Sequence, residues 1–171
     1  MIPREKPISK RCKISHRPEF RTQEPKFYVC PDCGSLIILN LPPLAAAGTG
    51  QVSCCGKPAA ELVPKPGKDE DFEFKVFGGF ENNALRVKIH SDSPVSWIYC
   101  KSFQGGQLKY LNRKNANTAI FAFAEDDAYV YCDRDVCRMG NEHCQFQCKR
   151  GTVIYAYAED AGLLRFDLKG F

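Results

Sequence analysis

Two close pairs of cysteines are the residues of this chain whose type and spacing most directly indicate chemistry. Cys30 and Cys33 form a C-x-x-C pair followed by Gly34, and the adjacent pair Cys54-Cys55 follows after an apolar loop. Four thiolates held in two such pairs can surround one tetrahedral iron or zinc ion. Gly34 allows the backbone amides to fold back towards the first two sulfurs. The sequence therefore predicts a metal site built from these four cysteines.

The adjacent pair can share a metal ion only if the chain turns sharply at that point. Neighbouring residues of an extended strand point to opposite faces. Gly56 and Pro58 follow Cys54 and Cys55 directly and are suited to a turn. The alternative is a thioredoxin-like redox pair at the first two cysteines, with the later two as buried thiols. No strand–CxxC–helix pattern surrounds Cys30, which favours the metal site.

A second group of cysteines lies towards the C-terminus, with the spacing C-x4-C-x6-C-x3-C and one histidine inside it. The candidate ligands of a second metal ion are Cys132, Cys137, Cys144 and Cys148, with His143 as a substitute. This spacing matches no common zinc-finger signature. Free cysteines are also commonly buried as small hydrophobic residues. The pattern leaves both interpretations open.

The composition is typical of a packed protein that keeps its thiols reduced. The chain has 171 residues, of which 44% are hydrophobic, enough for one medium domain or two small ones. Ten cysteines in a chain with no export signal and no membrane-length apolar segment indicate metal ligands rather than disulfides, and we expect a cytoplasmic protein of a prokaryote with no membrane association. The formal charge of +4 favours small anions or an acidic macromolecule and does not by itself indicate nucleic-acid binding.

The periodicity of the chain divides it into parts. Residues 1–25 are basic and contain prolines, which predicts an N-terminal arm able to contact nucleic acid or an acidic partner. Residues 26–63 place short strands around the first cysteine pair and predict a metal knuckle that depends on its ion for stability. Residues 64–68 have the composition of a linker. Residues 70–171 contain short alternating runs between turn signals, which predict an antiparallel β-sandwich.

The expected strands are short, and no long amphipathic helix interrupts them. In the second domain they are 72–76, 85–89, 95–99, 120–123, 129–131, 153–157 and 163–168. The last two are expected to form a terminal hairpin around the turn residues 160–162. The sequence therefore predicts a mainly β protein.

Two stretches of the chain resemble a known family. The run FYVCPDCGSLI…VSCCGKPAAELVP resembles the desulforedoxin-like domain, a small rubredoxin-type unit, that opens desulfoferrodoxins. The run from ALRVKIH to YVYCDRDVC is similar to their superoxide reductase domain, including the Trp-Ile strand at Trp97. The likeness spans residues 26–137. It implies a desulforedoxin-like metal knuckle followed by an immunoglobulin-like antiparallel β-sandwich.

The resemblance also implies which residues would hold metal. In that family the first domain binds iron through four thiolates. The matching positions are Cys30, Cys33, Cys54 and Cys55. The second domain holds ferrous iron through four histidines and an axial cysteine and reduces superoxide at an open position. Cys132 matches the axial cysteine, but the histidine three residues later is Asp135, and the histidine four residues before the tryptophan is Ser93.

The histidine content departs from the family. The chain has three histidines, His16, His90 and His143, so one chain cannot supply a four-histidine site. His90 could take the place of one lost histidine across a shortened loop. Cys132, Asp135 and His90 are therefore the catalytic candidates of a rebuilt iron site. The resemblance supports the fold and the first metal centre, and the missing histidines argue against the family's catalytic activity.

Three functions are compatible with these residues. The first is a redox protein that carries one electron on four-thiolate iron and exchanges it with an electron-transfer partner. The second is a structural zinc module that binds another macromolecule and catalyses nothing. The third is a superoxide-type oxidoreductase with a rebuilt iron site. Because family members pair, the resemblance is also compatible with a homodimer.

Overall fold

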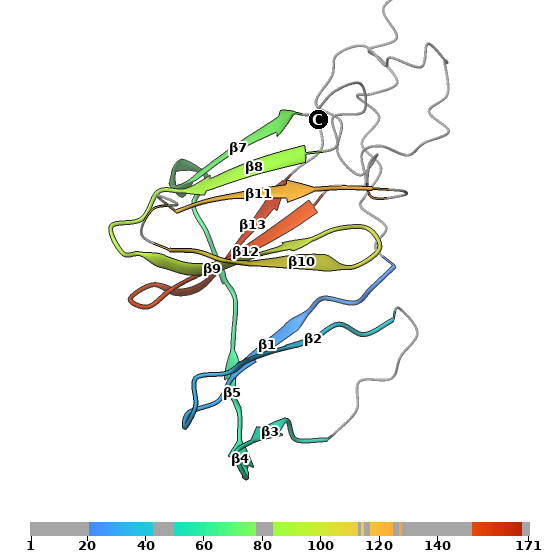
Figure 1. The fold of residues 1–171 in the computed structure, drawn as a ribbon, viewed down its shortest axis with the longest axis vertical. Coiled ribbons are helices and arrows are strands. Elements are labelled where there is room, and N and C mark those ends of the chain that lie inside the picture. The colour runs from blue at the N-terminus through green and yellow to red at the C-terminus, as the bar shows by residue number, and fades with distance from the viewer. Residues whose placement is uncertain are drawn as a thin grey trace, which may run out of the picture.

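The computed structural model shows a mainly β protein, as the sequence predicts (Figure 1). It describes residues 21–42, 50–77, 84–112, 114, 117–124, 127 and 152–168. Within these ranges no helix is long and apolar enough to span a membrane. One short 3₁₀ turn, η1 (Asp69–Asp71), precedes the larger group of strands.

The N-terminal strands form the knuckle. Strand β1 (Lys26–Val29) lies between β2 (Leu36–Leu39) and β5 (Ala60–Leu62), and both neighbours run antiparallel to it. Strands β3 (Ser53–Cys54) and β4 (Lys57–Pro58) form a separate small hairpin. The two cysteine pairs follow β1 and end β3, so this arrangement brings two distant turns to one place.

The remaining strands form a sandwich of two sheets. The larger sheet has the order β10-β9-β12-β13-β6, and the smaller has the order β11-β8-β7 (Figure 1). All neighbours are antiparallel except β13 and β6. The strands are β6 (Lys65–Pro66), β7 (Phe72–Phe77), β8 (Ala84–Ile89), β9 (Val95–Lys101), β10 (Gly106–Tyr110), β11 (Thr118–Ala122), β12 (Thr152–Ala158) and β13 (Gly162–Leu168).

The core between the two sheets follows from the alternation of each strand. On β8, Leu85, Val87 and Ile89 are buried, and the residues between them are exposed. They pack in one cluster with Ile98 of β9 and Ile154 of β12. Successive side chains of a strand point to opposite faces, so one face of each sheet fills the sandwich.

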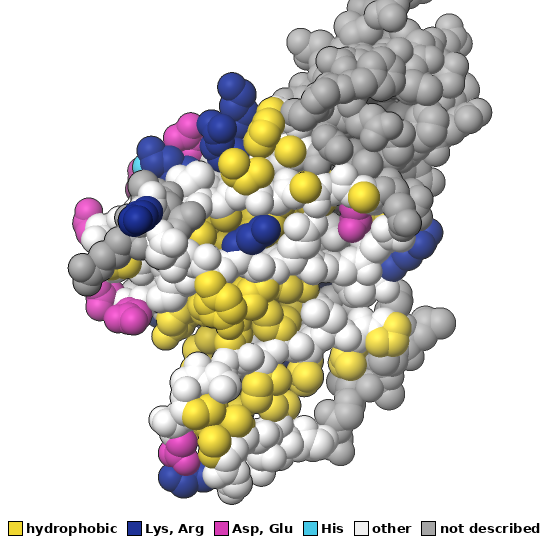
Figure 2. All heavy atoms as spheres, viewed as in Figure 1, with side chains coloured by type: hydrophobic (Ala, Val, Ile, Leu, Met, Phe, Trp, Pro, Cys, Tyr) yellow, Lys and Arg dark blue, Asp and Glu magenta, His cyan; other side chains and the backbone are white. Residues whose placement is uncertain are grey.

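The second face of the large sheet is covered by the knuckle. Phe27 of β1 is fully buried, and its ring centre lies 5.5 Å from that of Trp97, 5.4 Å from Tyr99 and 4.9 Å from Tyr155. Hydrophobic side chains gather on both sides of this boundary in Figure 2. Burying a phenylalanine side chain contributes about 2 kcal/mol, so this contact holds the knuckle against the sandwich.

An ion pair between a buried lysine and a half-exposed glutamate joins the same two parts. Lys101 of β9 is 2% exposed, and its ammonium group lies 3.0 Å from the carboxylate of Glu24. The Tyr155 hydroxyl donates a hydrogen bond to the same carboxylate. Burial alone would raise the pKa of Glu24, but the bonds from Tyr155 and Lys101 outweigh it and lower this pKa. Burial lowers the pKa of Lys101, which opposes its charge.

The segment at 64–68, which has the composition of a linker, contains a short strand in the structure. Residues 65–66 form β6, which pairs in parallel with β13. The amide of Gly67 donates to the carbonyl of Arg165 at 2.8 Å. A Cβ at Gly67 would lie 2.0 Å from the ring of Phe166, so only glycine allows this approach. The composition of this segment shows prolines and a glycine, but it does not show that the segment pairs with β13.

The other strand predictions agree with the structure where residues are described. Strands β8, β9, β11 and the β12–β13 hairpin lie where the alternation places them. The expected strand at 129–131 and most of the arm at 1–25 lie outside the described residues. The division into an arm, a knuckle at 26–63 and a sandwich at 70–171 stays a prediction.

The ion pair predicts a specific pattern of stability. Glu24→Ala leaves the buried Lys101 charge without its partner and should cost about 2 kcal/mol of unfolding free energy. Glu24→Ala combined with Lys101→Met removes both charges and should recover most of that loss. Denaturant unfolding of the wild type, both single variants and the double variant measures the coupling. Additive losses would show that the pair contributes nothing.

The same pair predicts a pH dependence. Because the native pKa of Glu24 is lowered, its stabilisation is complete above the ordinary value of 4.5 and is lost as the pH falls through the native value. Below pH 4.5, the thermal unfolding midpoint of the wild type should therefore fall more steeply with decreasing pH than the midpoint of Glu24→Ala. Parallel midpoint curves for the two proteins would contradict this assignment.

Candidate metal centre

The first two cysteines are held by a tight loop that follows β1. The amide of Cys30 donates to the carbonyl of Ser35 at 3.0 Å, and the amide of Gly34 donates to the carbonyl of Cys30 at 2.9 Å. Gly34 has a φ of 68°, in the left-handed region that glycine enters without strain. The loop therefore turns Cys33 back beside Cys30, as the C-x-x-C-G pattern predicts.

The second pair lies in the hairpin of β3 and β4. Cys54 is opposite Lys57, so Cys55 and Gly56 form a two-residue turn. Both have positive φ, 53° at Cys55 and 73° at Gly56, as a type I′ hairpin turn requires. This turn places two neighbouring side chains on the same side of the chain. The left-handed backbone conformation costs about 1 kcal/mol at a non-glycine residue such as Cys55, whose side chain supplies one of the four sulfurs.

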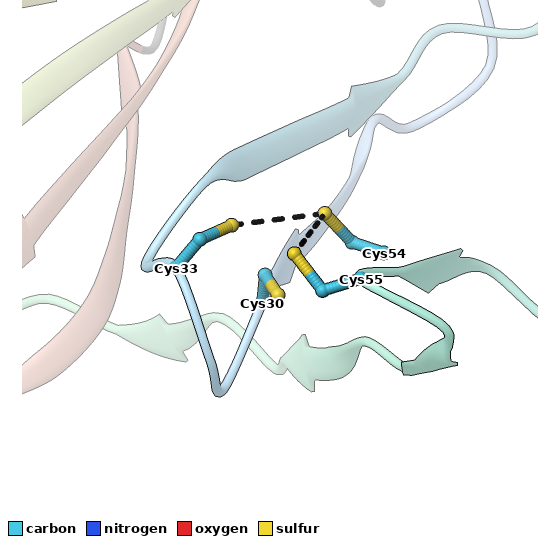
Figure 3. A group of neighbouring side chains, drawn as sticks. All are labelled: Cys30, Cys33, Cys54 and Cys55. Atoms are coloured by element: carbon cyan, nitrogen blue, oxygen red, sulfur yellow. Dashed lines mark hydrogen bonds between the residues drawn. The ribbon is translucent and has the colours of Figure 1, made fainter.

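The four sulfur atoms converge on one point (Figure 3). All lie within 4.8 Å of one another, with 3.7 Å between Cys33 and Cys54 and 3.9 Å between Cys54 and Cys55. Four sulfurs at about 2.3 Å from a tetrahedral ion would be about 3.8 Å apart. A disulfide would require about 2.05 Å. The donor set therefore fits one tetrahedral iron or zinc ion.

The thiols of this cluster hold their protons unequally. The Ser35 hydroxyl, 3.0 Å from the sulfur of Cys33, lowers the pKa of Cys33 to about 6. The bond with Cys30 raises the pKa of Cys54 to about 12, and Cys33 raises the pKa of Cys55. One thiolate forms readily, and its neighbours then resist a second negative charge. A cation among the sulfurs removes this conflict.

The centre lies at the surface of the knuckle. Cys30 is buried and Cys54 is half-buried, while Cys33 and Cys55 are exposed. Beside them Lys57 and Asp32 form an exposed ion pair at 3.0 Å, which links the two turns. All four ligands come from the protein, so a bound ion would have no open position for a substrate. The geometry suits ion retention and surface contact with another protein.

Most of the remaining metal and catalytic candidates lie where the structure gives no description. Cys132, Asp135, Cys137, His143, Cys144 and Cys148 lie outside the described residues. Across the described ranges, the four knuckle cysteines form the sole group that could hold a metal ion. His90 is exposed and lies 3.5 Å from Glu73. Cys100 is fully buried in the sandwich core, and burial raises the pKa of its thiol.

A cavity of about 1100 Å³ opens at the end of the sandwich where β9 begins. It contains Ser93, which the resemblance matches to a lost histidine, together with His90 and Ala161. The Ser93 hydroxyl donates to the carboxylate of Asp160, in the turn between β12 and β13. The amide of Val95 donates to the Asn117 side chain at 3.0 Å. The cavity is lined by hydroxyl, amide and apolar side chains and by charged ones, among them Asp71, Lys88 and Asp92.

The sequence patterns do not predict two of these groups. Ser35 is a partner of Cys33, and its position two residues later is the signal that could have identified it. Asp160 is expected only as a turn residue, and its position beside Ser93 depends on the pairing of β12 with β9. That pairing joins residues far apart in the sequence.

Comparison with known proteins supports the fold. No family model matches the chain, and no curated protein matches its sequence. The crystal structure of the superoxide reductase from Treponema pallidum matches with a TM-score of 0.55 and 17% sequence identity, over 84% of this chain and 98% of that chain. At this identity the likeness concerns the fold alone. It confirms the expected fold class, a metal knuckle followed by a superoxide reductase-like β-sandwich.

Removal of one ligand tests the centre. Cys54→Ser should lower metal affinity by more than about 100-fold, because a serine hydroxyl is a poor ligand for an ion that the other thiolates hold. Cys100→Ala removes a thiol of the sandwich core and should leave the metal content unchanged. Elemental analysis after dialysis against a chelator measures both. Equal metal loss in the two variants would rule out the assignment.

Proposed function

We propose that the protein is a redox protein that binds one iron ion in the four-thiolate centre and transfers single electrons. The observation that carries this proposal is the convergence of four sulfurs within 4.8 Å at the surface of a rigidly docked knuckle. Iron in a four-thiolate shell exchanges one electron between its ferric and ferrous states. The superoxide reductase fold of the structural neighbour favours iron over zinc.

The residues around the centre are suited to electron exchange. The exposed Cys33 and Cys55 would let a partner protein approach the ion closely. The docking of Phe27 and Glu24 on the sandwich keeps the knuckle in place. A donor bond to a sulfur, such as the one from Ser35, stabilises the more negative reduced state and tunes the potential.

The cavity beside Ser93 supports the loss of superoxide reductase chemistry at the second site. Ser93, which the resemblance matches to one of the family's histidines, bonds instead to the Asp160 carboxylate, and His90 is the histidine among the residues that line this cavity. A rebuilt iron site would need ligands from outside the described residues, such as Cys132 and Asp135.

Zinc in the same four thiolates is the alternative, since the closed donor set fits it equally well. The very short strands β3 and β4 favour a structural role for the ion, because a bound metal would then supply much of the knuckle's stability. In that case the protein is a structural zinc module for a binding partner. The two functions differ in the ion and in colour.

Metal content and colour test the proposal. Protein purified from its native host without added metal should contain about one iron ion per chain and show a thiolate-to-iron absorption band that dithionite bleaches. Elemental mass spectrometry and a visible spectrum measure these properties. A colourless protein with zinc would overturn electron transfer in favour of the structural module. Superoxide turnover that is lost in Cys132→Ser would favour the rebuilt site.

A second experiment tests whether the centre is redox-active in the way proposed. Ser35→Ala removes the bond to Cys33 and should lower the midpoint potential, because the reduced state loses more stabilisation than the oxidised state. Ser53→Ala changes an exposed serine next to Cys54 and serves as the control. Spectroscopic redox titration compares the three proteins. An unchanged potential in Ser35→Ala would show that the hydroxyl does not act on the centre.

A further inference from the structure

The outer face of the smaller sheet carries basic side chains that the proposed function does not use. Lys75 on β7 and Arg86 and Lys88 on β8 are exposed, and Lys75 lies directly opposite Arg86. The Arg86 guanidinium lies 5.4 Å from the ring centre of Phe77. Glu73, opposite Lys88, is the acidic side chain of this face. Figure 2 shows basic side chains gathered over this part of the sandwich.

A groove extends this face to the other sheet. It has a volume of about 320 Å³ and lies between β10 and β11, the edge strands of the two sheets. Lys109 and Tyr110 line one side, and Ile120 lines the other. Tyr110 is 68% exposed and Ile120 is 48% exposed. Ile120 is the cross-strand neighbour of Arg86, so the groove and the basic row form one surface.

This surface, called the basic face below, has an excess of positive charge. Its exposed cations are Lys75, Arg86, Lys88 and Lys109. In the part of the chain that the structure describes, no ion pair joins any of these four to a carboxylate. Acidic residues border this face at one end, where Glu73 is opposite Lys88 and where Asp71 and Asp92 line a cavity together with Lys88. The mild net charge of the whole chain gives no sign of this basic region.

The chemistry of the basic face favours a polyanion over a protein surface. Lysine is depleted in protein–protein interfaces, and three of these four cations are lysines. Two exposed apolar side chains, Tyr110 and Ile120, are too few to form the hydrophobic centre of such an interface. Arg86 and Lys88 are two residues apart on a strand, or about 7 Å, a separation suited to successive phosphates of an extended strand.

We infer that the basic face binds single-stranded nucleic acid. The cations neutralise phosphates, and the exposed ring of Tyr110 offers a stacking surface to an unpaired base at the groove. A paired base could not stack in this way, which is why a single strand is preferred. This inference goes beyond the proposed function and does not depend on which metal ion the knuckle holds.

Fluorescence anisotropy with a labelled, mixed-sequence single-stranded oligonucleotide tests the inference on the full-length, metal-loaded protein. The wild type should bind at about 50 mM salt and more weakly at about 200 mM salt. Arg86→Glu with Lys88→Glu should weaken binding by at least about tenfold and reduce the salt slope by about 0.7 for each lost phosphate contact. Tyr110→Ala should weaken binding by about tenfold with an unchanged salt slope.

A control variant has the same change of charge at two residues outside the basic face. Lys26→Glu with Lys65→Glu alters two exposed lysines on β1 and β6 and should bind as the wild type does. The basic N-terminal arm is present in every variant, so a difference between the two double variants reports the basic face. Thermal melting and metal content of each variant identify any loss of folding, and a variant that fails is replaced by Arg86→Gln with Lys88→Gln.

Three results would overturn the inference. The first is no binding by the wild type at about 50 mM salt. The second is equal weakening by the two double variants, which would mean that net charge or the arm carries the binding. The third is competition by polyglutamate as effective as that by unlabelled oligonucleotide, which would assign the basic face to an acidic protein instead.

Discussion

The burial of β9 on both faces is the constraint on which the rest of the structure depends. One face packs into the sandwich core through Ile98 and Cys100, and the other receives the knuckle through Trp97 and Tyr99. A strand covered on both sides cannot lose either partner without exposing a large apolar surface. The knuckle is therefore part of the sandwich's packing, and its metal-binding turns have a fixed place on the molecule.

The centre itself depends on two turns of different kinds. One is a loop closed by backbone bonds around Gly34, and the other is a hairpin turn with left-handed residues at Cys55 and Gly56. Each turn supplies two sulfurs, and the sheet around β1 brings the turns together. The unequal pKa values of Cys33 and Cys54 show that four such thiols are a poor arrangement for protons and a good one for a cation.

Local pattern allowed much of the fold to be predicted, and long-range pairing limited the rest. Alternation placed β8 and β9, and the spacing of the cysteines placed all four ligands, because both signals lie within a few neighbouring residues. Strand β6 at 65–66 pairs with a strand about a hundred residues later, and Ser93 bonds to Asp160, about seventy residues later. A local repeat in the sequence contains no information about such distant partners. The basic face could not be predicted for a related reason. The net charge of a chain contains no information about which side of a sheet each charged residue occupies.

The backbone at Cys55 has a consequence for the history of this position. Glycine would relieve the positive φ there, but glycine has no sulfur, so the ligand and the backbone preference are in direct conflict. A requirement for four thiolates around a metal ion would account for a cysteine in that conformation. In descendants or relatives that have abandoned the metal, drift should replace this residue early with glycine or asparagine. The amino acid at this single position can thus serve as a marker of whether a lineage still uses its metal centre.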